Sequence, residues 1–297
     1  MINRLPEWFK QDIVSDQAKD TKRVICGLGI NTVCQSAKCP NINSCFKNAR
    51  PAFMVLGDTC TRSCAFCAVK KAQGERLIND PDEPFKIAQA VKQLKIRHAL
   101  VTSVTRDDLA DGGAAIFAMC LEAIRDINDN VTAEVLIPDF KGEISSLRAL
   151  ASARPAVIAH NLETVRRLYG KLRPQADYAR SLEVLKNIKL LSASVITKTS
   201  MMLGLGEREE EVVESIKDIK DAGCDILTLG QYLAPSKENY PVKEFISPDK
   251  FRYYQDLAVG LGFKGVLSGP LVRSSYKAQE LYNGVSEFQM TKISRNA

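Results

Sequence analysis

A length of 297 residues, with 45% hydrophobic and 26% charged residues, suits one large globular domain or a domain with appendages. No stretch approaches the ~18 consecutive apolar residues of a transmembrane helix, and residues 1–11 lack the apolar region of an export signal. We therefore expect no membrane partner and a cytoplasmic location, or an organelle if a transit peptide has been removed. The net charge of +6 comes without a basic run interleaved with aromatic residues. Nucleic-acid binding thus has little support. The positive charge has two other interpretations: an ordinary surface of mixed charge, or a basic patch that binds an acidic partner.

Two cysteine triplets stand close together near the start of the chain. The first triplet is Cys34, Cys39 and Cys45, and the second triplet is Cys60, Cys64 and Cys67. A zinc site needs four ligands, usually in two close pairs, so these spacings do not favour zinc. Three thiolates in one short loop can instead hold three irons of a cubane cluster and leave the fourth iron open to a small molecule. The triplets therefore predict iron–sulfur chemistry.

The other three cysteines lie outside the triplets. Cys120 shares an apolar helical stripe with Ile124, and Cys224 directly precedes a strand-like run, so both are expected in the core. Cys26 is ambiguous, because it precedes the first triplet by only eight residues.

From residue 51 onward, short apolar runs alternate with amphipathic stretches. Six runs are predicted as strands: Ala52–Leu56, His98–Ser103, Val131–Ile137, Pro155–Ala159, Thr199–Leu203 and Asp225–Gly230. Helices are predicted between them, such as Pro84–Ile96, with a proline near its start, and Arg208–Ala222, with an acidic first turn. Six strand–helix units in series predict a parallel βα architecture.

Periodicity alone does not separate an open doubly wound sheet from a TIM-like barrel. Polar residues follow each predicted strand, among them Asp58 after the first and His160 after the fourth. The active face of a barrel needs such residues, so we predict an α/β fold with a partial TIM-like (βα)6 barrel. The expected organisation is an N-terminal extension, 1–50, the barrel, 51–245, and a C-terminal extension, 246–297, which ends in a short helix and a polar tail.

The second triplet carries a resemblance to a known superfamily. In the segment D-T-C-T-R-S-C-A-F-C, the C-x3-C-x2-C spacing with Phe66 before the last cysteine resembles the radical S-adenosyl-L-methionine (SAM) enzymes. The resemblance implies a catalytic [4Fe–4S] cluster on Cys60, Cys64 and Cys67, whose open iron chelates the amino and carboxylate groups of SAM. It also implies that an electron from this cluster cleaves SAM and releases a 5′-deoxyadenosyl radical.

The first triplet narrows the resemblance to one family. The C-x4-C-x5-C segment at residues 33–46 is similar to the auxiliary-cluster motif of the lipoyl synthases, and further segments match in order, including V-T-S-V-T-R-D-D-L-A-D-G-G, H-N-L-E-T-V and G-P-L-V-R-S-S-Y. Two positions depart from the family: Gln35 stands where Glu is common, and Asn239-Tyr240 stand where many members have a His-Leu pair. These departures leave the cysteines untouched and bear on the fine shape of the substrate or partner surface.

The resemblance implies the insertion of two sulfur atoms at carbons six and eight of an octanoyl chain on a lysine of a carrier protein. These carbons are unactivated, so acid–base catalysis cannot break their C–H bonds and a cofactor-derived radical is required. The resemblance further implies two [4Fe–4S] clusters, with the auxiliary cluster as the sulfur source. The implied partners are octanoylated lipoyl domains of 2-oxoacid dehydrogenases, the glycine cleavage H protein and an electron donor.

Other matched segments imply contacts to SAM. Six residues are candidates: Asp111, Gly112, Gly113, Asn161, Glu163 and Arg173. The first three occupy the place of the glycine-rich motif that contacts the methionine moiety, and the last three are candidates for ribose and carboxylate contacts. Each has a structural alternative, since Asp111 equally suits a helix cap and the others suit ordinary strand ends or helix starts.

The first triplet leaves one iron of its cluster without a ligand. Ligand softness favours Cys26, since thiolate suits iron better than alkoxide. The lipoyl synthase resemblance implies a serine of R-S-S-Y instead, with Ser275 preferred and Ser274 as the fallback. An oxygen ligand makes a weaker bond, which suits a cluster that is dismantled to supply sulfur. We therefore expect Ser275 as the ligand and Cys26 as a packed thiol, and the alternative for Ser275 is a helix cap.

Two other functions are alternatives. A biotin-synthase-like sulfur inserter would share the second triplet but lack both the upstream C-x4-C-x5-C and the terminal R-S-S-Y, and both are present here. A non-enzymatic iron–sulfur protein would hold clusters without converting SAM to 5′-deoxyadenosine.

Overall fold

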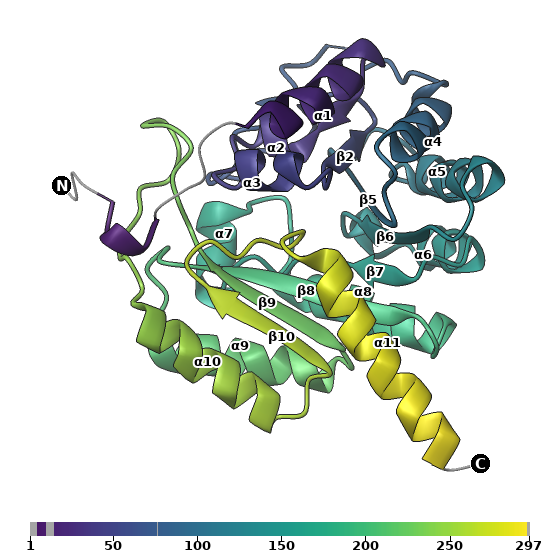
Figure 1. Ribbon diagram of the computed structural model, residues 1–297. Helices are drawn as coiled ribbons and strands as arrows, with labels where there is room; N and C mark the ends of the chain where they lie inside the picture. The colour runs from purple at the N-terminus through teal and green to yellow at the C-terminus, as the bar shows by residue number, and fades with distance from the viewer. Residues whose placement is uncertain (1–4, 10–14, 76, 296–297) are drawn as a thin grey trace.

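Figure 1 shows the fold as a computed structural model, which describes residues 5–9, 15–75 and 77–295. Its centre is an eight-stranded sheet in the order β1-β2-β5-β6-β7-β8-β9-β10. The strands are β1 (Asn31–Thr32), β2 (Ala52–Val55), β5 (His98–Ser103), β6 (Thr132–Leu136), β7 (Val157–Ala159), β8 (Ile196–Leu203), β9 (Ile226–Gln231) and β10 (Gly265–Gly269). Neighbours from β2 to β10 pair in parallel, and β1 joins β2 in antiparallel.

The sheet contains the six predicted strands and two more, β1 and β10. β2 and β9 are buried along their whole lengths, as expected of strands covered on both faces. β8 begins three residues before the predicted strand. The prediction started after Lys198 because a lysine is typical of an exposed strand end, but the side chain of Lys198 is buried. β10 extends the sheet beyond the predicted six strands by pairing with β9. Cys120 and Cys224 are buried in the core, as predicted.

Helices cover the outer face of the sheet. They are α4 (Glu83–Gln93), α5 (Ala114–Ile127), α6 (Ile144–Ser152), α8 (Tyr178–Leu191), α9 (Glu209–Asp221) and α10 (Pro248–Gly260). In Figure 1, α4, α5 and α6 lie at the right of the view, near β5 and β6, and α9 and α10 lie at the lower left, near β9 and β10. A parallel sheet in open order with helices outside it is a partial TIM-like barrel, so the predicted fold class is confirmed. Within the described ranges, no helix combines the length and apolar character needed to cross a membrane.

The segment before β2 packs against one side of the barrel. It contains α1 (Asp16–Gly27), α2 (Val33–Ser36) and α3 (Ile42–Lys47), after a 3-10 turn at Glu7–Phe9. Thr21 Oγ1 donates a hydrogen bond of 2.7 Å to the Phe46 carbonyl, which joins α1 to α3. The first triplet therefore sits on short helices that are held together by packing and by buried hydrogen bonds.

The end of the chain differs from the sequence-based expectation of a short helix. α11 (Ala278–Arg295) has 18 residues, and Gly284 in its middle weakens the apolar pattern by which it would be recognised. Its Leu281, Tyr282 and Val285 belong to one apolar cluster with the first residues of β7, β8 and β9. Figure 1 shows this helix, in yellow, crossing the strands. α11 therefore covers the amino ends of these strands.

A buried ion pair spans the inside of the barrel. Lys198 Nζ lies 2.7 Å from Glu134 Oε1, and both side chains are almost fully buried. They come from β8 and β6, which are separated by β7, so the pair crosses the interior. His98 Nε2 lies 3.4 Å from Glu134 Oε2, and the Tyr282 ring of α11 stacks on this imidazole. Burial opposes ionisation of Glu134, but Lys198 and then His98 outweigh it and lower the pKa of Glu134.

Lys198→Met is expected to lower the free energy of unfolding by about 3–5 kcal/mol, because it leaves the Glu134 carboxylate buried without its cation. The double variant Lys198→Met/Glu134→Leu should lose much less, since it removes both charges. Urea denaturation of the two variants and of Glu134→Leu alone measures the coupling. Additive losses in the double variant would contradict the interpretation.

Candidate functional site

A cavity of about 450 Å³ lies at the carboxyl ends of the barrel strands. Residues that end or directly follow neighbouring strands form its wall, among them Ser103 of β5, His160 after β7 and Met202 of β8. This is the end at which the sites of barrel enzymes form. The cavity is therefore the candidate active site.

The second triplet reaches this cavity on the loop after β2. The two-residue strands β3 (Thr59–Cys60) and β4 (Lys70–Lys71) pair in parallel, so the loop between them is closed at its base. Burial, and then the nearby thiols of Cys64 and Cys60, raise the pKa of Cys67 to about 12. All three thiols line the cavity and are near one another.

The first triplet reaches the same cavity from the N-terminal helices. Cys34 lies on α2, Cys39 follows that helix, and Cys45 lies on α3. Burial, and then the neighbouring thiol of Cys39, raise the pKa of Cys34 to about 12 and that of Cys45 to about 11. Cys34 and Cys39 line the cavity, whereas Cys45 packs against the apolar cluster around Cys34 and Phe46.

The two triplets fit clusters better than single ions. Over the ranges described, no group of three or more His, Cys, Asp or Glu side chains is placed to hold one metal ion. The thiols of each triplet are nonetheless close enough to raise one another's pKa. A cubane of four irons and four sulfides needs its thiolates spread around a larger body than a zinc ion, and each triplet offers such a set.

The loop of the second triplet is anchored by a buried arginine. Arg62 donates two hydrogen bonds to Asp107, at 2.7 and 2.9 Å, and a third to Asp139 at 2.6 Å. Burial opposes ionisation of Asp139, but Arg62 outweighs it and lowers the pKa of Asp139 to about 2. The Arg62 backbone N–H points at Cys60 Sγ, 3.4 Å away. One residue therefore ties the ligand loop to the ends of β5 and β6.

Three predicted SAM-binding residues form one hydrogen-bonded group in the cavity wall. Asn161 Nδ2 donates to Glu163 Oε1 at 2.9 Å, and Arg173 Nη1 donates to the Asn161 carbonyl at 3.2 Å. Burial raises the pKa of Glu163, although Arg173 opposes the shift. Arg173 also lies beside the Cys64 thiol, and Phe66 from the same loop lines the cavity. These residues are thus brought together next to the second triplet.

Three buried polar atoms of the cavity wall have no hydrogen-bond partner in the part of the chain that the structure describes: Ser103 Oγ, His160 Nε2 and Arg173 Nε. His160 Nδ1 lies 3.0 Å from the Ile137 carbonyl, so Nδ1 carries the proton and Nε2 is a free acceptor. Burial, and then Arg173, lower the pKa of His160 to about 4, which keeps the ring neutral at pH 7. Buried polar groups rarely stay unpaired, so these atoms fit a polar ligand such as SAM.

Asp111, Gly112 and Gly113 do not line the cavity. The Asp111 carboxylate accepts hydrogen bonds from the backbone N–H groups of Gly113 and Ala115, at 2.9 and 2.8 Å, at the start of α5. Gly113 has a φ of +92°, and a Cβ there would lie 2.3 Å from the Leu56 side chain. These contacts support the structural alternative for this segment, in which Asp111 caps the start of α5.

The serines of R-S-S-Y lie at the cavity, and Cys26 does not. Ser274 Oγ donates to Asn161 Oδ1 at 3.0 Å. Ser275 lines the cavity, and its hydroxyl has no hydrogen-bond partner among the residues that the structure describes. The expectation that Cys26 is packed is wrong, because its side chain is exposed. The buried residues of α1 are Ala18, Thr21 and Ile25.

Sequence patterns did not identify two polar residues of the site. Arg62 stands between two cysteines of the second triplet, and Arg273 begins R-S-S-Y. His160, in contrast, was expected at this end of the barrel because it follows the fourth predicted strand. Burial, opposed by Cys39 and Glu163, lowers the pKa of Arg273, which lines the cavity near both of these residues. The only sequence signal for Arg62 and Arg273 was that each lies within a motif. Their roles depend on partners that are far away in the sequence, such as Asp107 and Asp139 for Arg62.

Comparison with known proteins gives a family and close relatives. The profile of the Radical SAM superfamily matches residues 54–219. The lipoyl synthase of Caldanaerobacter subterraneus subsp. tengcongensis is 48% identical over 278 residues, which are 94% of this chain and 97% of that protein. The lipoyl synthase of Geotalea daltonii is 46% identical over 290 residues, 98% of each chain.

Solved structures with a similar fold have little sequence similarity. Methylornithine synthase aligns with a TM-score of 0.54 at 11% identity and covers 92% of both chains. HydG, a maturase of the [FeFe]-hydrogenase, aligns with a TM-score of 0.57 at 12% identity over 90% of this chain and 67% of that chain. At this identity the likeness shows the fold alone.

Arg62→Met is expected to weaken iron retention at the second triplet about tenfold. The loop loses its anchor, the half-buried Asp107 loses its partner, and the buried Asp139 keeps only the longer contact with Arg180. Arg62→Lys should be intermediate, since an ammonium cannot form the same two-pronged bond. Iron retained against a chelator is measured in a background with the first triplet replaced by alanine. The exposed Arg208→Met is the control, and equal retention in all variants would contradict the anchoring role.

Proposed function

This chain belongs to the lipoyl synthase family of the Radical SAM superfamily, and from that premise we propose which residues hold its cofactors and which partners it serves. It is a radical SAM sulfurtransferase that inserts two sulfur atoms, at carbons six and eight, into a protein-bound octanoyl group. It uses two [4Fe–4S] clusters and SAM. When bound, these cofactors supply the electron, the hydrogen-abstracting radical and the sulfur that the unactivated carbons require.

The two triplets divide the cofactors between them in this proposal. The second triplet holds the cluster that binds SAM, and the first triplet holds the cluster that supplies sulfur. The single observation that carries the proposal is that both triplets reach one cavity of about 450 Å³. A carbon radical formed beside one cluster then has sulfur within the same enclosed space, and other hydrogen donors are kept away. The apolar part of the wall, including Met201, Leu136 and Val272, suits an octanoyl chain.

SAM is proposed to contact the hydrogen-bonded group beside the second triplet. Asn161 and Glu163 offer polar atoms for the ribose, and Arg173 offers an unpaired buried N–H for the carboxylate. Phe66 supplies an apolar surface from the ligand loop itself. For Asp111, by contrast, the contacts support a helix-start role, so the segment 111–113 is left out of the proposed contacts.

Ser275 is the proposed fourth ligand of the auxiliary cluster. Its hydroxyl lines the cavity without a described partner, whereas Ser274 is engaged with Asn161 and Cys26 is exposed on α1. No contact in the structure supports a capping role for Ser275 at α11, whose described residues include its whole first turn. An alkoxide bond to iron is weaker than a thiolate bond, which suits a cluster that gives up its atoms.

The proposed partners are octanoylated lipoyl domains of 2-oxoacid dehydrogenases, the octanoylated H protein of glycine cleavage and a protein electron donor. A reducing compartment such as the cytoplasm is the proposed location. All nine cysteines lie in the described ranges, and none of them is in a disulfide. Thiolate ligands and iron–sulfur clusters both need such conditions.

Replacing the two triplets should have different effects. Cys60→Ala, Cys64→Ala or Cys67→Ala is expected to abolish 5′-deoxyadenosine formation, because SAM loses its cluster. Cys34→Ala, Cys39→Ala or Cys45→Ala should retain SAM cleavage but give no sulfur insertion. Product analysis by mass spectrometry, with iron and sulfide counts for each variant, makes the comparison. Equal loss of cleavage in both sets, with the other cluster intact, would refute the division of roles.

Ser275→Ala is expected to lower the iron content of the first-triplet site and to abolish lipoyl formation while SAM cleavage continues. Ser275→Cys should restore iron content, because thiolate is a stronger ligand, but slow sulfur insertion. Ser274→Ala and Cys26→Ala are the matched controls. If Cys26→Ala removed the auxiliary cluster while both serine variants made normal product, Cys26 would be the ligand.

A further inference from the structure

A second hollow, of about 600 Å³, adjoins the cavity. We call it the lysine groove, and its lining residues are Lys38, Cys67, Ala68, Val69, Lys70, Lys71, Gln73, Glu75, Ser236 and Asn239. Lys38, Cys67, Ala68 and Val69 line the cavity as well. The lysine groove is therefore a surface that leads directly to the candidate active site.

The lysine groove is basic. Lys38, Lys70 and Lys71 are exposed, and none of the three forms a salt bridge with a residue that the structure describes. Glu75 is the one acid among its described lining residues, and its carboxylate accepts a hydrogen bond from the Gln73 backbone N–H. The surface thus has more positive than negative charge among its lining residues. Lys70 lies near Glu75 and Lys38 near Glu238, so part of this charge is balanced within the chain without a salt bridge.

The backbone that carries these lysines is held by the cluster loops. Lys70 and Lys71 form β4, whose partner β3 contains Cys60. Lys38 stands between two cysteines of the first triplet, with a φ of +50°. On the far wall, Asn239 Nδ2 donates to the Cys67 carbonyl at 3.0 Å. The backbone positions of the three lysines beside the cavity are therefore set by the two cluster loops.

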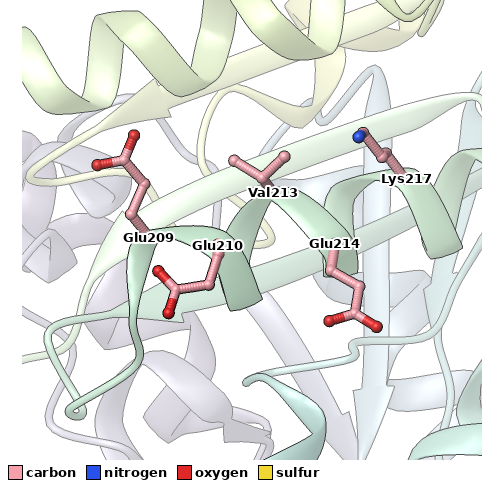
Figure 2. A pocket seen from close by; sticks show the side chains of 5 residues that line it. All are labelled: Glu209, Glu210, Val213, Glu214 and Lys217. Atoms are coloured by element: carbon pink, nitrogen blue, oxygen red, sulfur yellow. The ribbon is translucent and has the colours of Figure 1, made fainter.

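The contrast with another hollow argues for an acidic partner here. A hollow of about 540 Å³ lies on α9. Figure 2 shows the side chains that line it: Glu209, Glu210, Val213, Glu214 and Lys217. Its lining has three carboxylates and one lysine, so the excess of lining charge is opposite in sign to that of the lysine groove, although Glu209 pairs with Lys250 and Glu210 with Arg208. Opposite potentials on two surfaces steer a charged partner to one of them.

We propose that the lysine groove is the docking site for the octanoylated carrier protein, through an acidic patch around its modified lysine. This inference rests on the proposed function, because only a protein-bound octanoyl chain requires a macromolecule to dock beside the cavity. Docking over the lysine groove would place the acyl-lysine arm at the opening between the two cluster loops. Asn239, one of the two positions that depart from the family pattern, then lies in the partner surface.

The test uses the full-length enzyme with both clusters reconstituted. Lys70→Glu/Lys71→Glu is expected to raise the KM for an intact octanoylated carrier about fivefold or more, and to change turnover of a short octanoyl-lysyl peptide less than twofold. Lys92→Glu/Lys217→Glu, on α4 and α9, makes the same change in net charge and should leave both substrates unaffected. In the wild type, rising salt should weaken turnover of the carrier more than that of the peptide, and the groove variant should lose this difference.

The outcomes separate the docking proposal from the proposed function. An unchanged KM for the carrier in the groove variant, or an equal rise in the control variant, would overturn docking at the lysine groove. An equal loss on the peptide would assign the lysines to the cavity and not to carrier docking. Failure of the wild type to form lipoyl product from either substrate would instead contradict the proposed function. Iron content and 5′-deoxyadenosine formation show that each variant is folded and loaded.

Discussion

The buried side chain of Arg62 sets the position of the second triplet, and the geometry of the whole site depends on it. Its guanidinium bonds two carboxylates that follow neighbouring strands, Asp107 after β5 and Asp139 after β6. A planar fork with two partners fixes both the position and the direction of the loop, which a single point charge does not. Because the Arg62 N–H also points at Cys60 Sγ, the ion pairs and a proposed cluster ligand share one stretch of backbone. The barrel thereby fixes where a cluster can sit.

The other half of the site is built from the two ends of the chain. Asn41 Nδ2 donates to the Leu271 carbonyl at 2.5 Å, and Arg50 pairs with Glu280 at 2.5 Å, in each case across 230 residues of sequence. Arg273 lies near both Cys39 of the first triplet and Glu163 of the hydrogen-bonded group beside the second triplet. These contacts bring R-S-S-Y to the first triplet only in the folded chain. The proposed ligand Ser275 therefore reaches its cluster through tertiary structure, not through sequence spacing.

Local patterns identified the features of this protein that have local causes. Cluster ligands must be closely spaced on a loop, and buried parallel strands must be apolar, so both triplets and six strands could be recognised from the sequence. β10 was missed because its five residues, G-V-L-S-G, include two glycines and are only partly buried. Lys198 concealed the start of β8, because its cation is buried against Glu134 from a strand that is not its neighbour. The prediction for Cys26 was wrong because tertiary packing decides which face of α1 is buried. Ala18, Thr21 and Ile25 of this helix are buried, and Cys26 is exposed.

Burial of the proposed ligand thiols links the site to the stability of the fold. Burial, with neighbouring thiols, raises the pKa of Cys34 and Cys67 to about 12, so the cluster-free fold keeps these groups protonated. In the unfolded chain these thiols have the ordinary cysteine pKa of about 8.5, so they lose their protons near that pH. Their contribution to stability is thus fully present below that pH and is lost as pH rises toward about 12. A cluster binds thiolates and must displace the same protons, so its binding strengthens with rising pH. Cluster binding therefore stabilises the fold most where the free thiols would weaken it.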